Sequence, residues 1–122
     1  MSGKINILYI DDEIINLQVF TAFFKTKFNI ITALNTTMAR EILKTGKIDL
    51  VISDQKMPGE SGLSLLEDLK RNYPGLPRFM VTGFLNDIDI NKGRESGIIQ
   101  ELFYKPINRD LLTVKINEYT LN

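Results

Sequence analysis

Carboxylate side chains stand directly after two apolar segments of this sequence. Asp11 and Asp12 follow residues 5–10, and Asp54 follows residues 48–53. Such a cluster can hold magnesium, because Mg²⁺ prefers hard oxygen ligands and commonly binds through one or two carboxylates together with phosphate oxygens. A carboxylate such as Asp54 can then attack phosphorus and form an acyl phosphate. These residues therefore indicate phosphoryl transfer to Asp54, with Mg²⁺ as the cofactor.

A hydroxyl and an amine follow two further apolar segments. Thr82 comes after residues 77–81, and Lys105 comes after residues 101–104. An acyl phosphate on Asp54 would add charge that can draw Lys105 and the Thr82 hydroxyl into new hydrogen bonds. Because Thr82 begins the loop toward the fourth helix, its movement is expected to shift the surface formed by the fourth helix, the fifth strand and the last helix.

Formal charges favour a metal at this place. Two carboxylates about 4 Å apart repel each other by roughly 4 kcal/mol at an effective dielectric near 20, so a cluster of three needs a cation. Asp11, Asp12 and Asp54 together carry −3, and Mg²⁺ with the ammonium of Lys105 carries +3. With metal and amine in place, an anionic phosphoryl donor is no longer repelled.

Each of these residues, taken singly, also has an ordinary structural interpretation. The acidic residues after the first strand, Glu13 included, can cap a helix, where negative charge is favoured. Thr82 can begin a turn, Lys105 can be a solvated surface amine, and Asp54 can be a loop carboxylate. The functional interpretation therefore depends on the fold bringing all of them together.

Apolar residues form short continuous runs and helically spaced patterns in strict alternation. Strands are expected at residues 5–10, 28–33, 48–53, 77–81 and 101–104. Helices are expected at residues 14–27 and 36–44, from a Ser61 cap through Arg71, within 86–96, and after an Asn108 cap. In the second helix, Met38, Ala39, Ile42 and Leu43 are expected to face inward. Gly93 and Gly97 weaken the fourth helix, which we expect to be mobile.

This alternation predicts a parallel sheet with helices on both faces, since each crossover is right-handed. We expect an α/β fold of the flavodoxin-like, doubly wound type, with a five-stranded parallel sheet in the order 2-1-3-4-5 and five helices, in three layers α/β/α. The carboxyl ends of parallel strands share one edge, and a crevice opens where the strand order reverses, between the first and third strands. The polar residues that follow the strands are expected to meet there.

Composition excludes several classes of function. Fifteen basic and fifteen acidic residues give a formal net charge of zero, so no global field favours nucleic acid or an anionic membrane as a partner. The absence of cysteine excludes thiolate chemistry and fits a reducing compartment, so we expect a cytoplasmic protein. The absence of histidine excludes a phosphohistidine relay within these residues. We find no membrane span and no targeting signal.

The chain resembles the receiver domain of two-component response regulators, chemotaxis-regulator-like in outline, over almost its entire length. The residues that carry the resemblance are Asp11-Asp12, Asp54, Met57-Pro58-Gly59, Gly62, Thr82 and Lys105-Pro106, in this order and spacing. The resemblance implies that a sensor histidine kinase or a histidine phosphotransfer protein donates the phosphoryl group to Asp54. It also implies a downstream effector protein and slow hydrolysis of the aspartyl phosphate by water.

The resemblance further implies the ligands of the metal. Asp12, Asp54 and the backbone carbonyl of Lys56 would bind Mg²⁺, and Asp11 would act through a bound water. A cis peptide bond before Pro106 would place the neighbouring lysine in the site.

The sequence departs from the family at Leu102. The family usually has Tyr or Phe at this position, three residues before the conserved lysine, and that ring turns inward on activation. Tyr104 lies on the same side of the strand as Leu102 by period-two alternation, so it could replace this ring only approximately. Residues 1–122 are expected to form a single receiver domain without an output domain, which acts by docking to other proteins and is not an enzyme.

Two other functions remain as alternatives. A receiver-like scaffold would bind its partner without being phosphorylated, in keeping with Leu102. A phosphohydrolase of the haloacid dehalogenase type also uses an aspartyl phosphate with a threonine or serine and a lysine. That family has Asp-x-Asp after the first strand, whereas this chain has Asp11-Asp12-Glu13.

Overall fold

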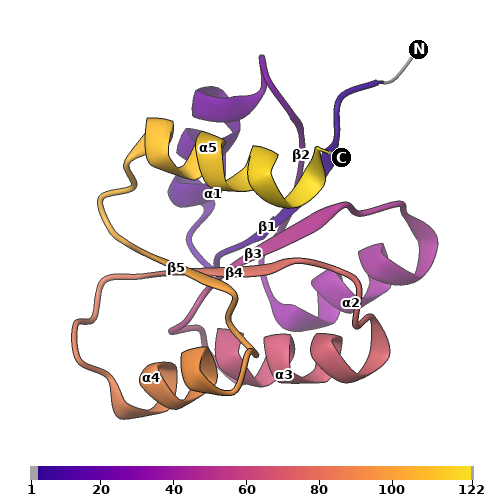
Figure 1. Cartoon of the computed structure of the whole chain (residues 1–122). Coiled ribbons are helices and arrows are strands. Elements are labelled where there is room, and N and C mark those ends of the chain that lie inside the picture. Colours follow the sequence, from indigo (N-terminus) through magenta and orange to yellow (C-terminus); the bar gives the residue numbers. More distant parts are fainter. Residues whose placement is uncertain (1–2, 122) are drawn as a thin grey trace.

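The computed structural model of the protein describes residues 3–121, in which strands and helices alternate (Figure 1). The strands are β1 (Asn6–Ile10), β2 (Asn29–Ala33), β3 (Leu50–Asp54), β4 (Arg78–Thr82) and β5 (Glu101–Tyr104). The helices are α1 (Ile14–Phe24), α2 (Thr36–Thr45), α3 (Gly62–Asn72), α4 (Ile88–Glu95) and α5 (Arg109–Thr120). Asp54 and Thr82 are thus the last residues of their strands, rather than the first residues of the loops that follow.

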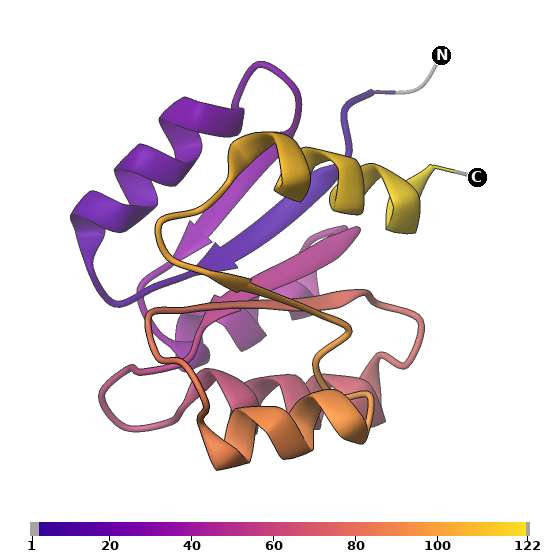
Figure 2. The same ribbon diagram turned by 60° about the vertical axis from the view of Figure 1, so that its left-hand side comes forward.

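All strands of the sheet are parallel, in the order β2-β1-β3-β4-β5. Figures 1 and 2 show α1 and α5 over one face of the sheet and α2, α3 and α4 over the other. The flavodoxin-like, doubly wound α/β fold in three layers is therefore confirmed. Because the chain leaves β1 and β3 toward opposite faces, the strand order reverses between them, which is where a crevice is expected at the carboxyl edge.

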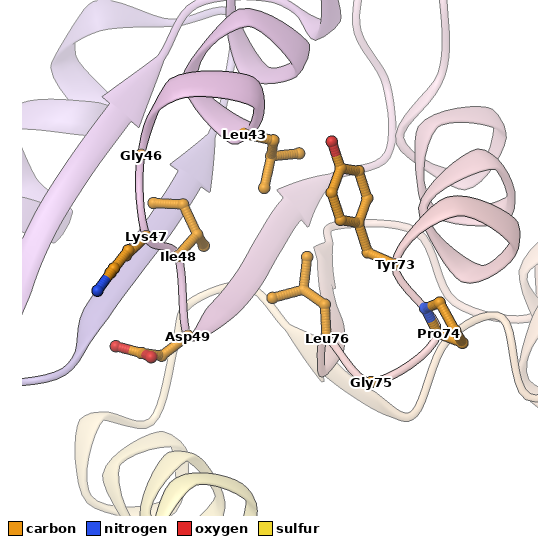
Figure 3. A pocket seen from close by; sticks show the side chains of 9 residues that line it. All are labelled: Leu43, Gly46, Lys47, Ile48, Asp49, Tyr73, Pro74, Gly75 and Leu76. Atoms are coloured by element: carbon orange, nitrogen blue, oxygen red, sulfur yellow. The ribbon is translucent and has the colours of Figure 1, made fainter.

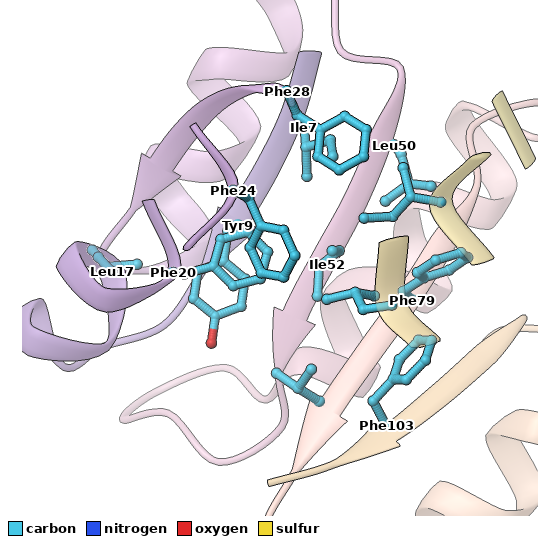
Figure 4. Close-up of a cluster of buried hydrophobic side chains, with 13 residues drawn as sticks. Ile7, Tyr9, Leu17, Phe20, Phe24, Phe28, Leu50, Ile52, Phe79 and Phe103 are labelled. Atoms are coloured by element: carbon cyan, nitrogen blue, oxygen red, sulfur yellow. The ribbon is translucent and has the colours of Figure 1, made fainter. Parts of the chain in front are cut away.

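Aromatic rings fill the layer between the sheet and the helices α1 and α5 (Figure 4). Tyr9 and Phe20 stack with ring centroids 3.9 Å apart. Phe79 meets Phe103 and Tyr119 with centroids 5.7 and 5.0 Å apart. A second apolar cluster, with three leucines of α3, fills the layer on the other face. The strands are therefore fixed by packing on both sides, which gives the residues at their ends a rigid base.

The apolar residues of α1 form two stripes at helical spacing, and only one of these stripes is buried against the sheet. Leu17, Phe20 and Phe24 are buried. Ile15, Val19 and Phe23 are exposed, by 68%, 43% and 42%. α1 has no charged residue along its length, so its spacing alone does not fix which stripe faces the sheet. The helix also ends at Phe24, three residues before the expected end.

The expectation that Met38 faces inward is wrong. Its side chain is 41% exposed, whereas Ala39 and Leu43 of the same helix are buried. Successive residues of a helix are about 100° apart around its axis, so a face centred on Ala39 and Leu43 leaves Met38 at its margin. The expected caps are confirmed, because Ser61 Oγ accepts from Ser64 N at 3.1 Å and Asn108 Oδ1 accepts from Leu111 N at 3.0 Å.

The two glycines near α4 each have a defined place. A Cβ on Gly93 would lie 2.6 Å from Leu63 Cδ1 and 3.2 Å from Ile99 Cδ1, so this glycine lets α4 approach α3 closely. Gly97 directly follows Ser96, the C-cap residue of α4. Its φ of +79° is the left-handed conformation in which glycine commonly ends a helix. The mobility of this helix stays a prediction.

Arg78, at the start of β4, is a buried cation that the sequence pattern does not reveal. It is 3% exposed, and its Nε, Nη1 and Nη2 donate to the carbonyl oxygens of Ile98, Leu76 and Gly97 at 3.1, 2.8 and 3.1 Å. Burial lowers the pKa of this guanidinium. Arg78 therefore fastens the loop between α4 and β5 to the rest of the sheet.

Arg78→Met is expected to lower the free energy of unfolding by about 2–3 kcal/mol, because three partly buried carbonyl groups lose their donor. Urea denaturation of the variant and the wild type measures the difference. Arg71→Met on the exposed side of α3 is the control and should change the stability by less than about 0.5 kcal/mol. An equal effect of the two substitutions would contradict this role of Arg78.

A second arginine ties two carboxylates to α2. Arg40 Nη1 and Nη2 donate to both carboxylate oxygens of Glu60, at 2.5 and 2.8 Å, and Nη2 also donates to Asp68 Oδ2 at 2.9 Å. Ser64 Oγ donates to Glu60 Oε2 at 2.8 Å. The hydrogen bonds from Arg40, assisted by those of Thr36 and Ser64, lower the pKa of Glu60 to about 2.

Glu60→Gln is expected to destabilise the protein at neutral pH and to matter less in acid. The pKa of Glu60 is depressed in the folded protein, so its stabilising effect is present above the ordinary value of 4.5 and is lost as the pH falls through about 2. The difference in unfolding free energy between wild type and variant should shrink across this window. Denaturant titrations at several pH values measure it, and a difference that does not change with pH would refute the pairing.

Candidate metal centre

Three carboxylates meet at the carboxyl edge of the sheet. Asp11 and Asp12 follow β1, and Asp54 ends β3, whose register places Ser53 beside Ile10. Each of the three aspartates offers a carboxylate oxygen, and these oxygens lie within 4.8 Å of one another. The sequence-based expectation that the fold gathers these carboxylates is therefore confirmed.

Asp11 is fully buried and heavily hydrogen-bonded. Its Oδ2 accepts from Tyr9 Oη at 3.2 Å and from Asn16 Nδ2 at 3.1 Å, and its Oδ1 accepts from Glu13 N at 3.0 Å. Glu13 is the residue at the helix cap, but its side chain makes no capping hydrogen bond. The carboxylate of Asp11 thus accepts from the turn before α1 and does not cap the helix itself. Asp12, in contrast, is exposed. One of its carboxylate oxygens lies within 4.8 Å of oxygens of Asp11 and Asp54.

Lys105 brings a positive charge to the cluster from the loop after β5. Its Nζ lies 3.2 Å from Asp54 Oδ1 and 3.5 Å from Asp11 Oδ2. Its backbone N donates to the carbonyl oxygen of Thr82 at 2.9 Å, and the peptide bond to Pro106 is cis. Burial opposes the charge of Lys105, but the carboxylates of Asp54 and Asp11 outweigh it and raise the pKa of Lys105.

The surroundings of Asp54 disfavour its charged form, chiefly through burial. Burial raises the pKa of Asp54, and the charge of Asp11 raises it further, whereas Lys105 acts in the opposite direction. The ammonium of Lys105 is thus placed among three carboxylates. Its effect is too small to bring the pKa of Asp54 back to the ordinary value. A divalent cation with a preference for carboxylate oxygens fits this donor set and this charge.

Thr82 and Lys56 lie on neighbouring elements of the same edge. Thr82 ends β4 and is fully buried, and its Oγ1 accepts from Phe84 N at 3.1 Å, a bond that does not use the hydroxyl hydrogen. The Lys56 ammonium lies 4.4 Å from the centroid of the Phe84 ring, at the rim of the site. The role of the Lys56 carbonyl as a metal ligand stays a prediction.

Three supporting residues were not predicted from the sequence. Tyr9 points to the same side of β1 as Asp11 because they are two residues apart in the chain, a signal that strand alternation could have supplied. Asn16 reaches Asp11 from the first turn of α1, and Gln55 Oε1 accepts from Leu63 N at 2.7 Å. The sequence does not predict either of these two contacts, because each depends on the conformation of a loop.

Gly62 allows the backbone at Asp54 to lie against α3. A Cβ on Gly62 would lie 2.1 Å from the carbonyl oxygen of Asp54 and 2.9 Å from Ser53 Oγ. Gly62→Ala is therefore expected to displace the end of β3 and to lower the free energy of unfolding by about 1–3 kcal/mol or more. Gly75→Ala is the control, since nothing lies within 4 Å of a Cβ there. If the two variants were equally stable in urea denaturation, the backbone would be able to avoid the contact at Gly62 without a loss of stability.

A wide hollow lies at the opposite edge of the sheet and is not part of this site. It is lined by the segments that lead into β3 and β4, among them Asp49 and Tyr73 (Figure 3). The carboxylates of the metal centre lie at the opposite, carboxyl edge of the sheet, after β1 and at the end of β3. Within residues 3–121, no helix is both long and apolar enough to cross a membrane.

Comparisons with known proteins agree with this geometry. Residues 7–117 match the family model of the response regulator receiver domain. The chain is 28% identical over 118 residues to the hydrogenase transcriptional regulatory protein HoxA of Bradyrhizobium diazoefficiens, a match that covers 97% of this chain and 24% of that protein. The chain thus spans about a quarter of the length of this relative.

Solved structures show the same architecture. The signal receiver domain of an HD domain-containing protein from Pseudomonas fluorescens Pf-5 superposes with a TM-score of 0.89 at 25% identity, covering 98% of this chain and 89% of that one. The response regulator protein TrrA of Thermotoga maritima, in complex with Mg²⁺ and beryllium fluoride, superposes with a TM-score of 0.81 at 26% identity, covering 94% and 98%. With three carboxylates and a lysine gathered at the carboxyl edge of a 2-1-3-4-5 sheet, this chain belongs to the response regulator receiver domains of two-component systems.

Proposed function

We propose that the protein accepts a phosphoryl group on Asp54 from the phosphohistidine of a sensor histidine kinase or a histidine phosphotransfer protein. The observation that carries this proposal is the position of Lys105, whose ammonium bridges Asp54 and Asp11 inside a cluster of three carboxylates. Residues 1–122 contain no histidine, so the phosphohistidine donor must lie outside them.

The transfer itself requires little of the protein beyond positioning and charge. A carboxylate oxygen of Asp54 attacks phosphorus, the bond between phosphorus and the donor nitrogen breaks, and that nitrogen keeps the electron pair. The ammonium of Lys105, 3.2 Å from Asp54 Oδ1, is placed to stabilise charge on the phosphoryl oxygens. The hydroxyl of Thr82 is free to turn its hydrogen toward the same oxygens.

The chain offers the ligands that a magnesium ion requires. Asp12, Asp54 and the backbone carbonyl of Lys56 would hold the ion, and Asp11 would act through a bound water. Bound there, Mg²⁺ would neutralise the charge that develops on the phosphoryl oxygens. The raised pKa of Asp54 supports this assignment, because burial disfavours the charged carboxylate and a bound cation would offset that cost.

The output of the switch would be the surface of α4, β5 and α5. Ile88, Tyr104, Leu111 and Val114 on these elements are exposed apolar side chains, by 69%, 40%, 48% and 52%, and they suit docking of a downstream effector protein. The match to receiver domains favours this function over the phosphohydrolase alternative. Slow hydrolysis of the aspartyl phosphate and a cytoplasmic location stay predictions.

One observation favours the scaffold alternative. Leu102 packs against the apolar cluster beneath α2, α3 and α4, and it carries no ring that could turn inward on activation. Phe103 belongs to the cluster on the other face of the sheet. A domain of this kind could bind its partner without being phosphorylated.

Phosphoryl uptake decides between the two functions. The protein is incubated with acetyl phosphate and Mg²⁺, or with acetyl phosphate and a chelator, and its intact mass is measured. In this reaction the P–O bond of acetyl phosphate breaks and acetate leaves with the electron pair. We expect the mass of one phosphoryl group to be added only when Mg²⁺ is present. No added mass, or equal addition with the chelator, would favour the scaffold.

A further inference from the structure

The loop between β3 and α3 lies beside the metal centre but has few bonds of its own. It comprises residues 55–61 and contains Lys56, whose backbone carbonyl is a proposed metal ligand. Within the part of the chain that the structure describes, the backbone groups of residues 56–59 make no hydrogen bond to other groups of the chain. In the middle of the loop, only side chains make contacts, because Met57 packs against the apolar cluster beneath α3 and the Lys56 ammonium lies over the Phe84 ring. The backbone there is therefore also positioned by contacts at the two ends of the loop.

The first end is fastened to α3. The side chain of Gln55 accepts a hydrogen bond from Leu63 N at 2.7 Å, and its backbone oxygen accepts from Gly62 N at 2.9 Å. These bonds fix the residue directly after Asp54. The residues that follow Lys56 are held by the packing of Met57 and from the other end of the loop.

The other end is held by the ion pair of Arg40 and Glu60. The guanidinium donates to both oxygens of the carboxylate, and the two side chains are 32% and 25% exposed. A bidentate pair of this kind fixes orientation as well as distance. Arg40 stands on α2, which is anchored to the sheet by the buried residues Ala39 and Leu43. The ion pair therefore ties the end of the loop to the body of the domain, and not only to α3.

We propose that Arg40 and Glu60 are positioning residues for the metal centre, which hold the β3–α3 loop so that the Lys56 carbonyl is in place when Mg²⁺ binds. This role rests on the proposed function. Mg²⁺ demands a nearly ideal octahedral arrangement of its ligands, so a carbonyl on a loosely held loop binds it less tightly. Residues that hold metal ligands in place typically change the affinity for the metal by about 10–100-fold when they are replaced.

Asp68 provides a matched control, because the same network could simply join α2 to α3. Its Oδ2 accepts from the same guanidinium at 2.9 Å, and its side chain is 31% exposed, close to the 25% of Glu60. Asp68 lies within α3, however, and has no bond to the loop. Asp68→Asn thus removes a comparable charge without releasing the loop.

The test compares the affinity for Mg²⁺ of the wild type, Glu60→Gln and Asp68→Asn by isothermal titration calorimetry, well below the unfolding temperature of each. We expect Glu60→Gln to bind Mg²⁺ about tenfold more weakly and Asp68→Asn to bind it like the wild type. Arg40→Met should weaken binding as Glu60→Gln does, and the double variant should show no further loss. Amide hydrogen exchange at Gly62 and Leu63, whose N–H groups donate to Gln55, should be faster in Glu60→Gln and in Arg40→Met but not in Asp68→Asn.

The outcomes separate this role from the function on which it rests. Wild-type affinity in Glu60→Gln, or equal weakening in Glu60→Gln and Asp68→Asn, would overturn the positioning role while the wild type still bound Mg²⁺. Failure of the wild type to bind Mg²⁺ at all would overturn the proposed function, and the positioning role would fall with it.

Discussion

Asp54→Asn is expected to abolish phosphoryl uptake. An amide oxygen carries no negative charge, so it is a poor nucleophile toward phosphorus and cannot form the acyl phosphate. The side chain keeps its size and its place at the end of β3, so the fold should not suffer. Intact mass after incubation with acetyl phosphate and Mg²⁺ measures the effect.

Asp89→Asn is the matched control for this substitution, since Asp89 is an exposed carboxylate on α4, and it should take up phosphate like the wild type. A folding control is also available. Burial and the charge of Asp11 raise the pKa of Asp54, which makes the charged form unfavourable in the folded protein. Without Mg²⁺, Asp54→Asn should therefore be at least as stable as the wild type at neutral pH. Uptake that survived in this variant would place the acceptor elsewhere.

Lys105→Met is expected to slow phosphoryl uptake by about a hundredfold or more, the usual effect of removing one donor that stabilises charge in a transition state. The methionine keeps most of the unbranched apolar stem and removes the ammonium that lies 3.2 Å from Asp54 Oδ1. The rate of uptake from acetyl phosphate, followed by intact mass over time, gives the magnitude.

Binding of Mg²⁺ should persist in Lys105→Met, because all three carboxylates remain and one competing positive charge has been removed. Slow uptake with intact metal binding would thus assign the lysine to the transfer step. Lys44→Met, at an exposed lysine of α2, serves as the control. A variant at Lys105 that takes up phosphate at the wild-type rate would remove this residue from the mechanism.

The fold and the core of the site were predictable because both depend on local patterns. Alternating apolar runs and helical spacing define the order of the elements, and the right-handed crossover then places Asp11, Asp12 and Asp54 at one edge. The cluster follows directly from this topology, since strand ends deliver the side chains. Lys105 also follows, because it stands where β5 ends.

Features that depend on packing between elements were harder to predict from the sequence. The apolar residues of α1 surround the helix, so its sequence does not reveal that Phe20 is buried and Val19 is exposed. The charge of Arg78 favours a surface position, and two of its carbonyl partners, Ile98 and Gly97, lie 20 and 19 residues further along the chain. Its burial therefore becomes apparent only in the folded chain. The Arg40–Glu60 pair joins residues 20 positions apart, on elements whose contact only the folded chain defines.

A crystal structure of the protein grown with Mg²⁺ and beryllium fluoride, the ligands present in the TrrA structure, would test the central claim most directly. We predict beryllium fluoride on a carboxylate oxygen of Asp54, in contact with Lys105 and the Thr82 hydroxyl. Mg²⁺ should lie among Asp12, Asp54 and the Lys56 carbonyl. A metal bound elsewhere, or an Asp54 carboxylate without the fluoride, would contradict a phosphoryl-accepting site at this edge of the sheet.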